Sequence, residues 1–145
     1  MLGEVGDRLD HSRVHFIGQL PHANYINVLQ VSSAHFYLTY PFVLSWSFIE
    51  ALACGCAVIG SSTPPVREVL KDRVNGLLVD FFSTEEIADR VDEILDHPDR
   101  MQKMRLAARK TAVEGFDFKR CQLPHWKRLL RQLIDGETPS VEMMG

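Results

Sequence analysis

The chain has 145 residues, of which 46% are hydrophobic and 24% are charged, and its formal net charge is −3. This composition is typical of one globular domain and excludes a disordered or fibrous chain. The slight acidity, without a basic cluster, gives no reason to expect nucleic acid or an anionic membrane as a partner. No apolar run is long enough to span a membrane, and the opening residues are too charged for a signal peptide. The three cysteines form no disulfide framework, so we expect a reduced, cytoplasmic protein.

Strand and helix patterns alternate through the first half of the chain. Reading from the N-terminus, we expect a strand over 13–17, a helix over 24–31, a strand over 34–39, a helix over 46–54 and a strand over 57–60. Gly55 follows the second helix in a C-terminal capping position. Cys54 and Cys56 beside it, like Cys121 further on, form no disulfide or metal pattern and are expected to be free thiols.

The second half contains mostly helical patterns. We expect a helix over 65–70, a strand over 77–79, and helices over 83–96, 98–113 and 118–134. Ser83 and Glu86 have the spacing of a capping box at the start of the third of these elements. Pro124 is expected to bend or interrupt the last helix because proline lacks the backbone N–H that a helix interior uses.

This order of elements predicts an α/β fold: a Rossmann-like parallel sheet of about four strands with flanking helices. Ligands in such sheets bind beyond the carboxyl ends of the strands. The loops after Ile17, Thr39 and Ile59 are therefore the places where a functional site is expected.

Glu50 is the most informative side chain at this edge, since it lies among apolar and small residues just after a strand-to-helix junction. The N-terminus of a helix favours a phosphate, and a carboxylate one turn further suits the two hydroxyls of a ribose. A structural alternative is a capping box, in which Glu50 accepts only from the backbone N–H of Ser47. Spacing alone leaves both interpretations open.

Several separated motifs carry a family resemblance. The stretch FIEALACGCAVIGSSTPPVREVLKDRVNGLLVDFFSTEEIADRVDEIL, with RVHFIG and Leu20-Pro21 before it, resembles the C-terminal, nucleotide-sugar-binding domain of retaining family 4 (group 1) glycosyltransferases, which have the two-domain GT-B fold. The likeness covers about residues 7–97. It implies a glycosyltransferase with a nucleoside diphosphate sugar as donor substrate. Residues 1–113 would form a partial nucleotide-sugar-binding domain, and residues 114–145 a C-terminal helix and tail.

The resemblance also implies roles for individual residues. These are Glu50 on the ribose, the amides of Ser45, Trp46 and Ser47 on the phosphates, Gly18, Gln19 and Leu20 on the nucleobase, and Phe42, Val43 and Leu44 near the sugar. For Gly18, a glycine required only by the turn is the alternative.

The chain departs from the family pattern at two places. Phe42 replaces the first glutamate of the family's E-x7-E pair, which puts the identity of the donor sugar in doubt. Pro64 and Pro65 replace a glycine pair, and Arg67 becomes a possible phosphate contact, with pairing to a surface acid as its alternative. The resemblance implies that no metal and no cofactor are needed, and the lack of a metal-ligand spacing among the histidines and of a DxD-type motif among the aspartates is consistent with this.

The matched motifs begin at the third strand of the family's domain, so the first two strands, their cationic side chains and the N-terminal acceptor domain have no counterpart. We therefore expect the chain alone to transfer little or no sugar, because charge on the leaving diphosphate would not be stabilised. The 13–17 strand would move beside 34–39 or pair with another copy of the chain, since open edges recruit partners. The apolar face of the last helix would be free for another contact or packed on its own domain.

Two other function classes remain for comparison. The first is a catalytically silent GT-B-like binding or assembly module that has lost the donor. The second is an NAD-dependent dehydrogenase domain, which the lack of a G-x-G-x-x-G motif argues against.

Overall fold

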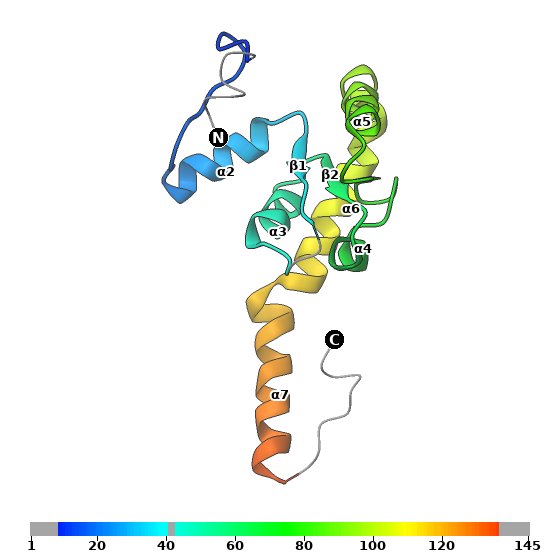
Figure 1. Ribbon diagram of the computed structural model, residues 1–145. Coiled ribbons are helices and arrows are strands. Elements are labelled where there is room, and N and C mark those ends of the chain that lie inside the picture. Colours follow the sequence, from blue (N-terminus) through cyan, green and yellow to red (C-terminus); the bar gives the residue numbers. More distant parts are fainter. Residues whose placement is uncertain (1–8, 41–42, 137–145) are drawn as a thin grey trace.

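The computed structural model describes residues 9–40 and 43–136. Their elements, in chain order, are α2 (His22–Val31), β1 (His35–Tyr37), α3 (Trp46–Ala53), β2 (Val58–Ser61), α4 (Pro64–Val69), β3 (Leu77–Val79), α5 (Thr84–Asp96), α6 (Pro98–Phe116), the π-helical turn η1 (Phe118–Gln122) and α7 (Leu123–Ile134). Within these residues, β1, β2 and β3 form one parallel sheet in that order. The predicted α/β fold with a parallel sheet and flanking helices is confirmed (Figure 1).

The central strand β2 is buried along its whole length and supplies both halves of the core. Successive side chains of a strand point to opposite faces. Val58 packs with Phe48 and Leu52 of α3, whereas the neighbouring Ile59 packs with Leu77 of β3 and Ile94 of α5. The sheet therefore separates an α3-side cluster from an α5-side cluster.

Helix α6 contributes to both clusters. Met101 and Met104 in its first half belong to the α5-side cluster, and Ala108 and Ala112 in its second half belong to the α3-side cluster. The small alanines let α6 approach α3 closely. Arg105, between the two pairs, donates to the carbonyl oxygens of Gly55 (2.9 Å) and Ser32 (2.8 Å), which terminate α3 and α2.

The predicted strand over residues 13–17 is wrong. These residues have no strand structure, and the side chains of Phe16 and Ile17 are 68% and 58% exposed. Figure 1 shows this segment (blue) outside α2, away from the sheet. A short apolar run forms a strand only where a neighbour accepts its hydrogen bonds, and in the described part of the chain no neighbour does so. The described sheet consequently has three strands instead of about four, and the segment does not move beside β1.

The C-terminal helices follow the predicted pattern with shifted boundaries. Helix α6 continues to Phe116 rather than Val113, and Pro124 lies in the first turn of α7, where its missing N–H costs no hydrogen bond. The helix changes from π-helical to α-helical turns just before Pro124, while the backbone at Gln122 and Leu123 stays helical, so the chain is not interrupted there.

Helix α7 (orange in Figure 1) extends away from the sheet and has no buried residue. Its apolar side chains Trp126, Leu130 and Leu133 are more than half exposed. The sequence left open whether this apolar face packs on its own domain or is free for another contact. Among the described residues, it does not pack on the domain. In the described part of the chain, each helix is too short or too polar to span a bilayer.

Candidate functional site

The start of α3 tests the capping-box interpretation of Glu50. Helix α3 begins at Trp46, with Ser45 as its N-cap, and the Ser45 hydroxyl accepts from the backbone N–H of Ser47 at 3.2 Å. Ser47 is therefore already the second residue of the helix, and its amide is satisfied by the N-cap side chain. The alternative capping box between Ser47 and Glu50 is wrong.

The carboxylate of Glu50 instead reaches across to α2. Its Oε1 atom lies 3.0 Å from Nε2 of His22, at the start of that helix. The side chains are 33% and 73% exposed, so the pair lies at the surface and its second carboxylate oxygen has no protein partner among the described residues. His22 is a contact that sequence reasoning missed, because no pattern links residues 28 positions apart.

The Glu50 charge also acts on a neighbouring phenol. Tyr25 lies one turn after His22, and its buried hydroxyl has no hydrogen-bond partner in the described part of the chain. Burial, and then the negative charge of Glu50, raise the pKa of Tyr25. Tyr25 therefore stays a neutral phenol beside the carboxylate.

The two cysteines near α3 are thiols rather than thiolates. Burial raises the pKa of Cys56 to about 11, and Cys56 donates to the carbonyl oxygen of Leu29 at 3.1 Å. Burial also raises the pKa of Cys54. The expectation of free thiols is confirmed, and these pKa directions argue against a reactive cysteine here.

The amides at the start of α3 are partly used inside the protein. Ser45 N–H donates to the Tyr37 hydroxyl at 2.9 Å, and Ser47 N–H donates to Ser45. Only the amide of Trp46, among these three, has no protein acceptor within the described residues. The Trp46 side chain is 75% exposed.

The other predicted site residues lie at different degrees of exposure. Gly18 has a φ of +62° and open space around it, so the turn by itself requires glycine, and Gln19 is exposed beside it while Leu20 is half-buried. Val43 is exposed, whereas Leu44 packs against the α3-side cluster. Phe42 lies outside the described residues.

Arg67 is exposed on α4 and forms no ion pair with any described carboxylate. The alternative that it pairs with a surface acid is therefore wrong for the described part of the chain. The same residues contain no group of three His, Cys, Asp or Glu side chains that could hold a metal ion.

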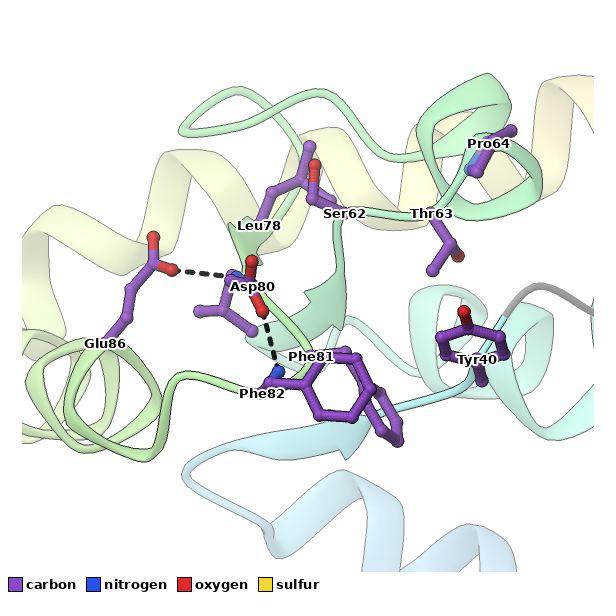
Figure 2. Close-up of a pocket in the computed structure, with 10 residues that line it drawn as sticks. Tyr40, Ser62, Thr63, Pro64, Leu78, Asp80, Phe81, Phe82 and Glu86 are labelled. Carbon is purple, nitrogen blue, oxygen red and sulfur yellow. Dashed lines mark hydrogen bonds between the residues drawn. The ribbon is translucent and has the colours of Figure 1, made fainter.

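A pocket lies at the carboxyl ends of the strands, where the fold predicts a site. Two of the three loops expected from the sequence, those after Thr39 and Ile59, contribute to it. It has a volume of about 480 Å³ and is lined by residues of the segments that follow β1, β2 and β3, among them Tyr40, Ser62, Thr63, Asp80, Phe81 and Phe82 (Figure 2). We call it the β2–β3 pocket. The segment after β3 was not predicted, because the strand over 77–79 was not considered a site element.

The start of α5 shapes this pocket. Ser83 accepts from the backbone N–H of Glu86 at 3.2 Å, which is one half of the predicted capping box. The Glu86 carboxylate does not return the bond to Ser83 but accepts from the N–H of Asp80 at 2.7 Å. Glu86 thereby becomes part of the pocket wall.

Comparison with known proteins identifies the family. Residues 8–111 match the family described as Glycosyl transferases group 1. The chain belongs to this family. The group 1 glycosyltransferase resemblance expected from the motifs is thus confirmed.

Two curated proteins illustrate the relationship. An alpha-maltose-1-phosphate synthase of Mycolicibacterium smegmatis is 30% identical over an alignment of 76 residues that covers 48% of this chain and 20% of that protein. An uncharacterized glycosyltransferase of Methanocaldococcus jannaschii is 24% identical over 123 residues, which are 84% of this chain and 31% of that protein. The group 1 glycosyltransferase chain therefore spans at most about a third of these relatives.

Solved structures share the fold. A sucrose-phosphate synthase from Thermosynechococcus elongatus superposes with a TM-score of 0.82 at 26% identity, over 93% of this chain and 34% of that one. The Anabaena protein HepE, solved in complex with UDP, has a TM-score of 0.76 at 19% identity, over 90% of this chain and 35% of that one. The fold of this group 1 glycosyltransferase chain is that of GT-B enzymes.

Proposed function

We propose that the chain is the donor-binding, C-terminal part of a retaining family 4 glycosyltransferase that transfers a sugar from a nucleoside diphosphate sugar to an acceptor. Membership of the group 1 glycosyltransferases supports sugar transfer, and the UDP in the HepE structure supports a nucleotide in the related fold. The order of the motifs around Glu50 supports the C-terminal, donor-binding part.

The observation that carries the proposal is the position of the Glu50 carboxylate. It does not fold back on its own helix; His22 holds one of its oxygens at 3.0 Å, and the other oxygen is unpaired among the described residues. A carboxylate can accept several hydrogen bonds, so this one has capacity for the two hydroxyls of a ribose. The contact with His22 restricts the rotamers of Glu50 and orients it before the ligand arrives.

The remaining contacts follow from the same arrangement. The amide of Trp46, at the start of α3, is available to a phosphate oxygen, and the helix dipole favours that anion. Gly18, Gln19 and Leu20 would face the base, Phe42, Val43 and Leu44 the sugar, and Arg67 remains a candidate phosphate contact.

Calorimetric titration with UDP, GDP and ADP tests the proposal. We expect heat with one of them, and a loss of at least about tenfold in affinity in Glu50→Ala, because both ribose hydrogen bonds disappear. Asp92→Ala removes an exposed carboxylate of α5 and is the matched control, with unchanged affinity expected. Equal affinity of Glu50→Ala and Asp92→Ala would contradict the ribose role.

One observation favours a second candidate, a catalytically silent binding or assembly module. Two of the three amides at the start of α3 are already satisfied by Tyr37 and Ser45, which reduces the donors left for a diphosphate. Silence with all three nucleotides would support this module.

We further propose that donor binding needs no metal and that these 145 residues alone transfer little sugar. The affinity for the nucleotide should then be the same with and without a chelator. The chain should bind the nucleotide sugar, but a transfer assay should detect no turnover. The reason is that the cationic groups that stabilise a leaving diphosphate have no counterpart among the matched motifs. Metal-dependent binding, or efficient transfer, would contradict these two statements.

A further inference from the structure

Thr63 is a buried hydroxyl without a partner in the wall of the β2–β3 pocket. The residue is 7% exposed, and its Oγ1 atom has no hydrogen-bond partner among the described residues. Thr63 is the N-cap of α4, but the next two residues are Pro64 and Pro65. Pro65 lacks the N–H of the second helical position, and the hydroxyl makes no hydrogen bond to the N–H of the third residue, Val66, so the cap leaves it unsatisfied.

Figure 2 shows the Thr63 side chain and the Tyr40 hydroxyl pointing toward each other across the pocket. Leaving a buried hydroxyl unsatisfied costs about 1–3 kcal/mol. Such a group in a concave pocket indicates a place where a ligand supplies the missing hydrogen bond.

Two carboxylates set the electrostatics of the β2–β3 pocket. Asp80 accepts from the N–H of Phe82 at 2.7 Å and takes part in no ion pair among the described residues. Glu86 accepts from the N–H of Asp80 and lies 4.0 Å from Arg90. Two acids with only one distant cation make the pocket negative, which disfavours a phosphate.

Three aromatic rings form the apolar part of the same pocket. Tyr40, Phe81 and Phe82 contact one another edge to face, with ring centroids 4.9 to 6.0 Å apart. Yet Tyr40 and Phe82 are 64% and 73% exposed. The contacts among the rings fix their positions while leaving flat apolar surface open to a ligand.

We propose that the β2–β3 pocket binds a neutral sugar ring. Each hydroxyl of Thr63, Ser62 and Tyr40 both donates and accepts, and a sugar hydroxyl does the same. The oxygens of a phosphate mainly accept, and a tetramethylammonium ion has no N–H to donate, so neither satisfies these hydroxyls as fully. The aromatic rings face the C–H surface of the sugar, and Asp80 accepts from its hydroxyls. The volume of about 480 Å³ is in the range of small-molecule sites.

The sugar at this pocket is the acceptor rather than the sugar of the donor. This assignment rests on the proposed function, in which the nucleotide lies at Glu50 and its sugar near Phe42, Val43 and Leu44. The β2–β3 pocket is lined mainly by the segments after β2 and β3, and Tyr40 alone comes from the segment that also holds Phe42, Val43 and Leu44. A group 1 glycosyltransferase would then carry part of its acceptor contact on the same domain as the donor.

Amide NMR titration of the complete chain with methyl α-D-glucopyranoside tests the binding. We expect saturable shifts at Ser62, Asp80 and Phe82, and affinity lowered about tenfold in Phe82→Ala through loss of the ring contact. Phe118→Ala is the matched control, since Phe118 is 63% exposed outside the pocket.

Thr63→Val separates a binding role from a structural one. It keeps the shape of the side chain and removes the unsatisfied hydroxyl, so the fold should be equally or more stable while the sugar binds several-fold more weakly. Lower stability with unchanged sugar affinity would contradict the role of Thr63.

Parallel titrations with inorganic phosphate, tetramethylammonium, UDP and UDP-glucose complete the test. Pocket shifts with phosphate or tetramethylammonium and none with the glucoside would overturn the proposal. So would UDP-glucose that displaces the glucoside from these amides, because the pocket would then hold the donor's sugar. Pocket shifts with the glucoside but no binding of UDP would support the sugar pocket and contradict the nucleotide site instead.

Discussion

Asn75 lies in the turn before β3, and its side chain is 4% exposed. Its Oδ1 atom accepts from Lys71 N–H at 2.6 Å, and its Nδ2 atom donates to the carbonyl oxygen of Val69 and to the Thr111 hydroxyl, both at 2.9 Å. One amide therefore closes the turn after α4 and attaches it to α6. The sequence predicted only a turn at Asn75-Gly76, since spacing does not show a partner 36 residues away.

Asn75→Ala should destabilise the fold by about 2–3 kcal/mol, because Lys71 N–H and the Val69 carbonyl lose their partner in partly buried hydrogen bonds. Denaturant unfolding measures the difference. Asn27→Ala, at an exposed position of α2, is the control and should change the free energy of unfolding by less than about 0.5 kcal/mol. Similar losses in both variants would contradict the role of Asn75.

Glu93 gives the fold an acid-sensitive contact. Hydrogen bonds from Arg73, and then from Arg90, lower the pKa of Glu93, with burial acting in the opposite direction. A carboxyl whose folded pKa is depressed stabilises the fold above its unfolded pKa of about 4.3, and this contribution disappears as the pH falls through the folded value.

Stability should therefore rise with pH in the window just below about pH 4.3, and Glu93→Gln should reduce this slope. Unfolding measured at a series of acidic pH values provides the comparison. Asp92→Asn, an exposed neighbour, is the control and should keep the slope of the unchanged chain. An unchanged slope in Glu93→Gln would show that the ion pair with Arg73 contributes nothing to folding.

Among the elements, α6 is the one whose importance the sequence did not indicate. Its periodicity predicted a helix, but not that Arg105 would reach the carbonyl oxygens that terminate α2 and α3. Helices and β3 were predictable because their patterns are local. The 13–17 segment was mispredicted because strand formation depends on a neighbour that the pattern does not contain. For the same reason the sequence indicated Glu50 and the loops after Thr39 and Ile59, but neither His22 nor the part that the segment after β3 has in the β2–β3 pocket.

Arg105→Met keeps the aliphatic stem and removes both donors. We expect a loss of about 1.5–3 kcal/mol in the free energy of unfolding, since hydrogen bonds from a charged group are stronger than neutral ones. Lys103→Met, at an exposed position of the same helix, should cost less than about 0.5 kcal/mol. Equal effects in the two variants would show that α6 is held by its apolar contacts alone.

The whole molecule consists of a two-sided core and a helix, α7, that stands outside it (Figure 1). A chain that ends at Gln122 should keep the thermal unfolding midpoint of the longer chain, because α7 buries none of its residues. It should also bind less of a hydrophobic fluorescent dye, since Trp126, Leu130 and Leu133 are removed. Circular dichroism and dye fluorescence measure the two effects, and a lower midpoint would show that α7 supports the core.

The crossing of α6 over both clusters has a consequence for synthesis of the protein. A ribosome releases the strands long before residues 101–112, which cover both sides of the central strand. Until then, Val58 and Ile59 lack part of their apolar surroundings on either side, and the nascent polypeptide exposes surface that chaperones recognise. Folding is therefore expected to wait for this late helix and then to complete both halves together.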